Sequence, residues 1–471
     1  MIARGGGTLD ITLTGPLILL LWVLVTVNLW TGVDGFAVAS AVLLAPLIFL
    51  MALRASRPRL IFVGIGLSLF VIAVLTRPNW LSLTEEALER SAFITAYFAA
   101  LATLRHAADT SPSVAACGMF LAHQPPGRRY IALSAGAQVF AIPLNYGSIA
   151  LLGSLAKASA QDEPDEVVRN HRIRRMLLAI QRGFNGMLTW SPLAFAVVIT
   201  TILLPEAVWA RALPYLLVTS ALLVGIGWAL DTIFKPRVPG RAPARATSDY
   251  GTWGSVLPLA VLLSVLLGLA VALHLSTGHK VTTVILLLVP AVAAIWFGVQ
   301  GPKGGHVTTA ATRSMNMVRN DLPTYREEFI MMAMSGFIGT LGGELLTPVI
   351  EATGFDLARL PGWVALVALV WLTPLAGQIG MSPLLAVTLM FPIIPHPAEI
   401  GVTPTALFVA ITGGWALGAA SSPIAAPTLL VARFGGVTPS WVSWRWNGAY
   451  TLLCGLAISA WVFILATFGL G

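Results

Sequence analysis

Charged residues are scarce in this chain. Asp, Glu, Lys and Arg make up only 10% of the 471 residues, whereas 57% are hydrophobic. A water-soluble globular domain carries about 25% charged residues, so this composition excludes one. The apolar residues come in runs of bilayer-spanning length, not in the short alternating segments of a membrane β-barrel. The composition therefore predicts an all-α polytopic membrane protein.

Cysteine is rare, and catalytic motifs are missing. The two cysteines, Cys117 and Cys454, are predicted in a cytoplasmic loop and a late span, where they make neither a disulfide framework nor a metal site. The sequence has no HExxH, GxSxG, Walker A or CxxC pattern, and no cluster of His, Asp and Glu inside the predicted spans. We therefore predict no enzyme activity, no cofactor and no metal beyond Na⁺ as a coupling ion.

Eleven apolar stretches are long enough to span a bilayer. They cover residues 16–33, 36–53, 59–76, 91–107, 184–204, 211–230, 253–275, 282–299, 328–350, 404–432 and 446–470. Alternating the loops between two faces places 23 of the 28 Lys and Arg residues on one face and 5 on the other. Because short basic loops stay in the cytoplasm, we predict a bacterial inner-membrane protein with its N-terminus inside and its C-terminus outside. The same sorting accounts for the net charge of +8, so no nucleic-acid partner is predicted.

Two further apolar segments, 130–156 and 362–395, carry a Pro and Gly interruption. If each segment were a single span, every later loop would move to the opposite face of the membrane, and the basic residues would no longer gather on one face. As re-entrant hairpins, which enter and leave on the same side, they preserve the sorting of basic residues. Non-helical backbone at membrane depth is tolerated only inside protein or along a cavity. The hairpin tips are therefore candidate binding sites.

The two halves of the sequence contain similar segments in the same order, which indicates an internal repeat. The matches lie 236, 240 and 231 residues apart: Arg90, Phe93 and Ile94 with Arg326, Phe329 and Ile330; Gln138, Pro143 and Leu144 with Gln378, Pro383 and Leu384; Gly183, Phe184 and Ser191 to Ala194 with Gly414, Trp415 and Ser422 to Ala425. We predict an N-terminal segment with an extra helix (1–34), repeat 1 (35–233), a cytoplasmic linker (234–252) and repeat 2 (253–471). Each repeat has an odd number of full spans, so the second is inverted, an arrangement typical of secondary transporters.

The hairpin interruptions supply candidate substrate-binding residues. Proline breaks helical hydrogen bonding, and the positive end of a half-helix can hold an anion without a charged side chain. The candidates are Gln138, Asn145 and Ser148 in the first hairpin and Gln378, Ser382 and Thr388 in the second. A proline kink stabilised by polar packing is the alternative at each position.

A second pair of interruptions supplies candidate coupling-ion residues. Unwound carbonyls beside Ser or Thr hydroxyls make a suitable cage for Na⁺, and they could serve a proton-coupled carrier differently. The candidates are Thr189 and Ser191 before Pro192, Ser421 and Ser422 before Pro423, and the intramembrane carboxylate Glu344. Kink packing, and for Glu344 solvation near the outer interface, are the alternatives.

The arrangement resembles the ion transporter superfamily, especially the divalent anion/sodium symporter family. Segment 382–392 is similar to that family's second hairpin motif and the helix after it, although Pro383 and Leu384 replace its Asn and Thr. The first tip, Ile142 to Asn145, also lacks the motif. Segment 331–354 resembles the family's Gly-rich span, and segment 413–438 its second broken helix. The resemblance implies eleven spans, two hairpins, a homodimer and an elevator-like mechanism.

These patterns together predict a secondary active transporter. Its solute would be a small organic or inorganic anion, driven by Na⁺ or H⁺ and held between hairpin tips and broken helices. One alternative is a cation/proton antiporter on the same scaffold, with Glu344 as the exchanging group. A membrane-embedded enzyme or an assembly subunit is the other.

Overall fold

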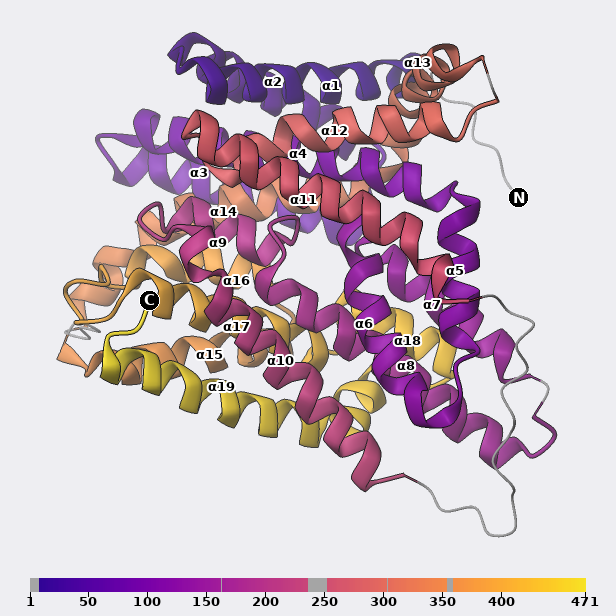
Figure 1. The fold of residues 1–471 in the computed structure, drawn as a ribbon. Coiled ribbons are helices and arrows are strands. Elements are labelled where there is room, and N and C mark those ends of the chain that lie inside the picture. Colours follow the sequence, from indigo (N-terminus) through magenta and orange to yellow (C-terminus); the bar gives the residue numbers. More distant parts are fainter. Residues whose placement is uncertain (1–7, 162, 236–251, 303, 354–358) are drawn as a thin grey trace. The chain divides into compact units, whose positions relative to one another are not determined.

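The computed structural model describes residues 8–161, 163–235, 252–302, 304–353 and 359–471. Within these ranges the chain is helical, and ten helical runs are long and apolar enough to cross a membrane (Figure 1). This confirms the predicted all-α membrane fold. Most of the predicted linker 234–252 lies outside the described residues.

The predicted span 91–107 is helical but is not one of these ten runs. It forms the second part of α4 (Trp80–Asp109), whose first part carries Glu85, Glu86, Glu89 and Arg90. These charges lower the mean hydropathy of the helix. The other ten predicted spans each correspond to one of the ten apolar runs.

The chain divides into two compact units. Unit 1 comprises residues 1–107, 268–355 and 387–394, and unit 2 comprises residues 108–267, 356–386 and 395–471. The helices of unit 1 are α1 (Thr8–Thr31), α2 (Asp34–Ala52), α3 (Arg57–Thr76), most of α4, α12 (Val281–Val299), α13 (His306–Asn316), the π-helical turn η3 (Met317–Asp321), η4 (Leu322–Tyr325), α14 (Arg326–Ala352) and η6 (Phe391–Ile393).

Helix α14 packs against α2, α3 and η6 in unit 1. Its glycines allow close approach of the segment after Ala386. A Cβ on Gly339 would lie 1.9 Å from Thr388 Oγ1, and one on Gly343 would lie 2.4 Å from Pro392 Cγ. The Gly-rich stretch therefore serves backbone packing inside this unit.

Unit 2 contains the first arm of each predicted hairpin and both broken helices. Its helices are α5 (Pro112–Ala122), α6 (Pro126–Leu144), α7 (Gly147–Ser159), α8 (Glu166–Trp190), α9 (Phe195–Leu203), α10 (Trp209–Ile233), η2 (Trp253–Val256), α15 (Gly362–Gln378), α17 (Pro404–Ser421), α18 (Ala426–Gly435), η7 (Trp441–Trp446) and α19 (Gly448–Phe468). Helices α11 (Leu257–Thr277) and α16 (Pro383–Met390) each contribute their first part to unit 2 and their second part to unit 1.

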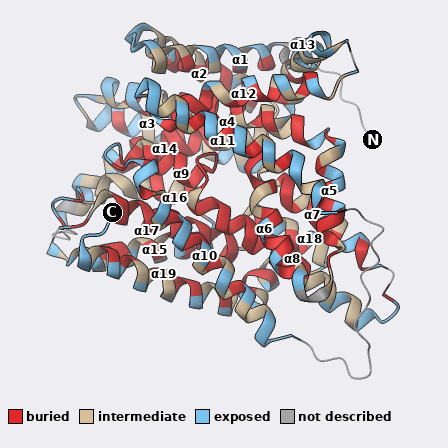
Figure 2. Cartoon of the chain, viewed as in Figure 1, coloured by how far each residue is buried: buried red, intermediate tan, exposed pale blue. Residues whose placement is uncertain are grey.

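Two broken helices form the core of unit 2. The α8–α9 run and the α17–α18 run contact each other, and 89% of the apolar window of each is buried (Figure 2). Helices α6, α7 and α10 pack on α8, while α15 and α19 pack on α17. The interruptions therefore lie in the best-buried part of the unit.

A pair of echoed glycines brings each hairpin arm onto its broken helix. A Cβ on Gly183 of α8 would lie 2.2 Å from the carbonyl oxygen of Ser134 on α6. A Cβ on Gly414 of α17 would lie 2.9 Å from the carbonyl oxygens of Leu369 and Val370 on α15. Small residues let helix backbones approach closely in membranes. The two positions matched in sequence thus perform the same packing task.

The expectation for Cys117 was wrong. This residue is buried in the apolar helix α5, because the segment 112–122 is helical and packs against α6 and α7. Cys454 is buried in α19 as expected for a late span.

Candidate functional site

The first hairpin turns at one strained residue. Helix α6 ends at Leu144, directly after Pro143, and α7 begins at Gly147. Asn145 between them has φ 48° and ψ −127°, and it is the only non-glycine residue with positive φ in the described ranges. Such a conformation costs about 1–3 kcal/mol and persists only where the surroundings fix it. The observed strain marks this tip as a functional candidate.

Ser148 holds this turn in place. Its hydroxyl donates to the carbonyl oxygen of Asn145 at 2.7 Å, and its N–H donates to the same oxygen at 3.0 Å. Ser148 is fully buried, so its hydroxyl is committed to the turn. The side chain of Asn145 is half-buried and has no hydrogen-bond partner among the described residues. Asn145 is therefore the member of this pair that can contact a solute.

Gln138 ties α6 to the end of α8. Its Oε1 accepts hydrogen bonds from Trp190 Nε1 at 2.9 Å and from Ser220 Oγ at 3.1 Å. Trp190 is the last residue of α8, directly before the break. The predicted substrate residue Gln138 thus supports the break through its carbonyl oxygen.

Gln378 makes the matching connection in the second half. Its Nε2 donates to the carbonyl oxygen of Ser421 at 3.0 Å, and its Oε1 accepts from Trp444 Nε1 at 3.0 Å. Ser421 is the last residue of α17. Each echoed glutamine therefore joins the first arm of its hairpin to the end of the following broken helix.

Ser382 caps the short helix after the second interruption. The chain turns through Gly380, which has φ 91°, and α16 begins at Pro383. Ser382 Oγ accepts from the N–H of Leu385 at 3.2 Å, the usual N-cap hydrogen bond. The hydroxyl thus satisfies a backbone donor that the helix start leaves open.

The interruptions after α8 and α17 each begin with a serine in extended conformation, Ser191 and Ser422. Ser191 Oγ accepts from the N–H of Leu193 at 3.3 Å, and Ser422 Oγ donates to the carbonyl of Gly377 at 2.9 Å. Thr189 Oγ1 donates to the carbonyl of Gly186 at 2.9 Å. Three of the four predicted coupling-ion hydroxyls thus make packing hydrogen bonds. The fourth, Ser421 Oγ, is buried and has no partner within the described ranges.

The sequence did not single out Asn185, which is the least satisfied polar residue of α8. It is fully buried, and neither its amide nitrogen nor its amide oxygen has a partner among the described residues. An unpaired buried polar group costs about 1–3 kcal/mol, so such groups call for a water, an ion or a ligand. Asn185 lies four residues after Gln181, hence on the same helix face, one turn closer to the break. Regular polar spacing of Gln181, Asn185 and Thr189 was the available signal.

A cluster of hydrogen-bonded polar side chains surrounds Gln181, one helical turn before Asn185 in the sequence. Gln181 Nε2 donates to Thr428 Oγ1 at 3.3 Å, and Gln181 Oε1 accepts from Asn447 Nδ2 at 2.9 Å. Thr428 in turn donates to the carbonyl of Ala419 at 3.3 Å. These hydrogen bonds join α8, α17, α18 and the end of η7. They place the face that carries Asn185 against the second broken helix.

Arg182 is a buried cation held by neutral groups. Its guanidinium donates to the carbonyl of Gly227 at 3.2 Å and to Asn447 Oδ1 at 3.4 Å, and it lies 4.5 Å from the centre of the Tyr450 ring. Carbonyl and ring contacts of this kind satisfy an arginine without a carboxylate. The contacts join α8 to α10 and α19.

Thr388 and Glu344 lie in unit 1, so they do not join the residues above within one unit. Thr388 Oγ1 donates to the carbonyl of Ser335 at 3.2 Å in the packing of α14. The side chain of Glu344 is exposed, and its carbonyl accepts from Arg77 Nη2 at 3.1 Å.

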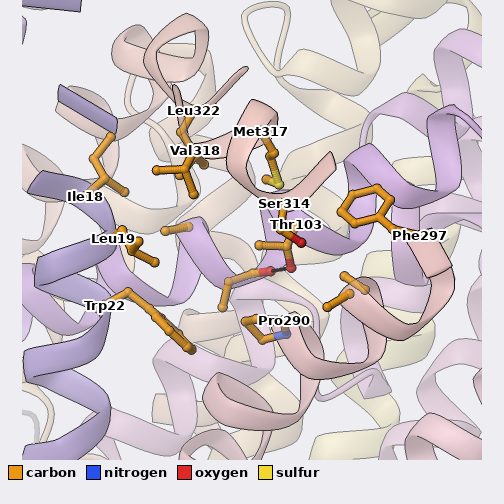
Figure 3. Close-up of a pocket in the computed structure, with 14 residues that line it drawn as sticks. Ile18, Leu19, Trp22, Thr103, Pro290, Phe297, Ser314, Met317, Val318 and Leu322 are labelled. Carbon is orange, nitrogen blue, oxygen red and sulfur yellow. Dashed lines mark hydrogen bonds between the residues drawn. The ribbon is translucent and has the colours of Figure 1, made fainter. Parts of the chain in front are cut away.

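An apolar cavity of about 120 Å³ lies inside unit 1 (Figure 3). It is lined by α1, α4, α12 and the α13–η3 segment, with Trp22, Pro290 and Phe297 among its walls. The hydroxyl of Thr103 on its wall donates to the carbonyl of Ala100 at 2.6 Å. None of the predicted site residues lines this cavity.

Oxygen atoms are the ligands that the breaks of unit 2 offer to a cation. No group of three or more His, Cys, Asp or Glu side chains that could hold a metal ion occurs in the described part of the chain. Hydroxyl, amide and carbonyl oxygens suit hard cations. The arrangement can therefore bind an alkali cation or water, and half-helix N-termini can bind an anion.

Solved transporter structures share this arrangement of helices. The YdaH transporter of Alcanivorax borkumensis superposes with a TM-score of 0.54 at 16% identity, over 88% of this chain and 100% of that one. MtrF of Neisseria gonorrhoeae, described as illuminating a class of antimetabolite efflux pumps, superposes with a TM-score of 0.57 at 12% identity, over 89% and 96%. The chain has the fold of these transporters. No family model matches the sequence, and a search of curated proteins gave no match.

Proposed function

We propose that this protein is a secondary active transporter for a small organic or inorganic anion, coupled to Na⁺ or H⁺. The observation that carries the proposal is the meeting of two interrupted helix systems within unit 2. Gln138 and Gln378 bind each hairpin arm to a helix end at a break. Broken helices joined in this way are the usual architecture of a transporter binding site.

The anion preference is argued from the chemistry of the breaks. Helices α7, α9, α16 and α18 all begin at an interruption, so four partially positive helix ends are available. The described residues of the breaks, 145–146, 191–194, 379–382 and 422–425, include no Asp or Glu to attract a cationic solute. We assign solute contact first to Asn145, because Gln138, Ser148, Gln378 and Ser382 use their side chains to hold helices and turns.

The coupling ion is assigned to the face of α8 that carries Asn185, together with Ser421. Both side chains are buried and both contain an oxygen atom without a partner in the described structure. Thr189, Ser191 and Ser422 support the breaks around them. An exposed carboxylate such as Glu344 is poorly suited to ion exchange inside the protein, so antiport through Glu344 is the weaker hypothesis.

An elevator-like mechanism and a homodimer complete the proposal. Both hairpin starts and both broken helices belong to unit 2, so that unit contains the whole predicted transport machinery apart from Thr388 and Glu344. The finer resemblance to the divalent anion/sodium symporter family, with its Na⁺ coupling, remains part of this proposal, as does the bacterial inner membrane.

The direct test is transport by purified protein in liposomes. A panel of small carboxylates and inorganic oxyanions is offered with a Na⁺ gradient, with a pH gradient and with neither. We expect at least one anion to accumulate above its equilibrium level under one gradient only. Channel-like flux that ignores both gradients, or chemical conversion of a solute without accumulation, contradicts the proposal.

A further inference from the structure

An apolar groove opens on the surface of unit 2. It has a volume of about 320 Å³ and lies among α5, α6 and η2. Its walls include Cys117, Leu121, Phe140 and the ring of Trp253. Trp253 packs edge-on against Phe120 at 5.2 Å yet remains 58% exposed, so the groove keeps a large apolar wall uncovered.

One face of α6 forms the floor of this groove. Ile131, Ala135 and Val139 line it at four-residue spacing, and Arg128 stands at its end. Ile131 is 50% exposed, and Ala135 is also exposed. The eleven-residue advance from Arg128 to Val139 corresponds to about 16 Å of helix. This length is about half of the 30 Å hydrocarbon core, the depth of a single lipid leaflet.

The charged end of the groove is basic. Arg128 is exposed, and no carboxylate pairs with it in the described ranges. Its neighbour Arg129 is half-buried, and this burial, together with the like charges of Arg172 and Arg175, lowers the pKa of Arg129 to about 10. Arg129 therefore stays charged at neutral pH. Arg175 is paired with Asp231 at 2.6 Å, whereas neither Arg128 nor Arg129 pairs with a carboxylate in the described part of the chain, so these two arginines make this end of the groove positive.

We propose that this groove binds one anionic phospholipid, with an acyl chain along the Ile131–Ala135–Val139 face and the phosphate at Arg128. The helix from Arg128 to Val139 has about the length of one leaflet, and Arg128 stands where a headgroup would lie. Trp253 adds an aromatic wall of the kind that membrane proteins place at the lipid–water interface. A zwitterionic lipid fits the groove equally well but lacks the net charge that the arginines favour.

The test uses full-length protein in detergent, delipidated and then titrated with phosphatidylglycerol or phosphatidylcholine. Native mass spectrometry counts bound lipids, and a thermal shift reports their effect. Arg128→Gln should weaken phosphatidylglycerol binding about fivefold, the effect expected for one basic residue at an anionic surface. Ala135→Phe, which fills the groove from an exposed position, should remove the tight site. Arg57→Gln and Ala221→Phe, two exposed positions outside the groove, should leave it intact.

Three results overturn the assignment. Equal stabilisation by inorganic phosphate or glycerol phosphate shows that the site binds an anion and not a lipid. Loss of binding in Arg128→Gln with unchanged binding in Ala135→Phe shows surface attraction without an acyl-chain groove. Equal retention of phosphatidylcholine and phosphatidylglycerol removes the role of the arginines. None of these outcomes depends on transport, so the lipid site and the proposed function stand or fall separately.

Discussion

At the scale of single residues, two asparagines define the site more sharply than the serines around them. Asn145 is strained and carries a half-buried side chain, while Asn185 is buried with an unpaired amide. The predicted hydroxyls of Ser148, Ser191 and Ser422 make hydrogen bonds that hold the turns and breaks. In the proposed function, contact with solute and ion is therefore assigned to the two asparagines, whereas the three serines hold the backbone.

Replacing Asn145 with glycine separates the two explanations of the first tip. Glycine adopts φ 48° without steric cost, so Asn145→Gly should raise the free energy of unfolding by about 1 kcal/mol. The same change removes a solute contact and should reduce transport about tenfold or more. Thermal stability and liposome uptake are measured on the same preparation. A more stable protein with unaltered uptake identifies the tip as a kink alone.

Replacing Asn185 with leucine tests the coupling-ion assignment. Leucine has a similar shape and no polar group to desolvate, so Asn185→Leu should keep or raise thermal stability by up to about 1–2 kcal/mol. The stabilisation by Na⁺, or the pH dependence of transport, should disappear. Thr200→Val is the matched control, because Thr200 is buried and bonds only its own helix. Preserved ion dependence in Asn185→Leu rules out this residue as an ion ligand.

At the scale of elements, glycine contacts decide which helices move together. Gly183→Ala should destabilise the protein by about 2 kcal/mol or more, since the new methyl group meets the backbone oxygen of Ser134. Gly414→Ala should act in the same direction with a smaller effect, because its nearest atoms lie at 2.9 Å. The measurement is thermal unfolding in detergent. Gly225→Ala in α10, with nothing within 4 Å, should be neutral or stabilising.

The sequence predicts the positions of helix interruptions better than it predicts which side chains contact each other between helices. Pro143, Pro192, Pro383 and Pro423 mark every interruption, because a missing N–H is a local property. The unpaired state of Asn185 depends on which side chains of α17 and α18 face it, and that is a tertiary fact. Thr388 was grouped with the second hairpin by proximity in sequence, yet its hydrogen bond joins it to α14.

At the scale of the whole molecule, the sorting of basic residues predicts an orientation that labelling can test. Arg57→Cys should react with a membrane-impermeant maleimide only from the cytoplasmic side, and Lys280→Cys only from outside. Both positions are exposed, and the natural thiols Cys117 and Cys454 are buried and give little background. Intact cells are compared with inverted membrane vesicles. Reaction of both variants from one side contradicts the predicted topology.

The contacts of Gly183 and Gly414 limit how this protein can open. The backbones of α6 and α8, and those of α15 and α17, are in close contact. The hydrogen bonds of Gln138 and Gln378 add a second contact to each pair of helices. The first arm of each hairpin, α6 or α15, therefore moves together with the broken helix that it contacts, α8 or α17.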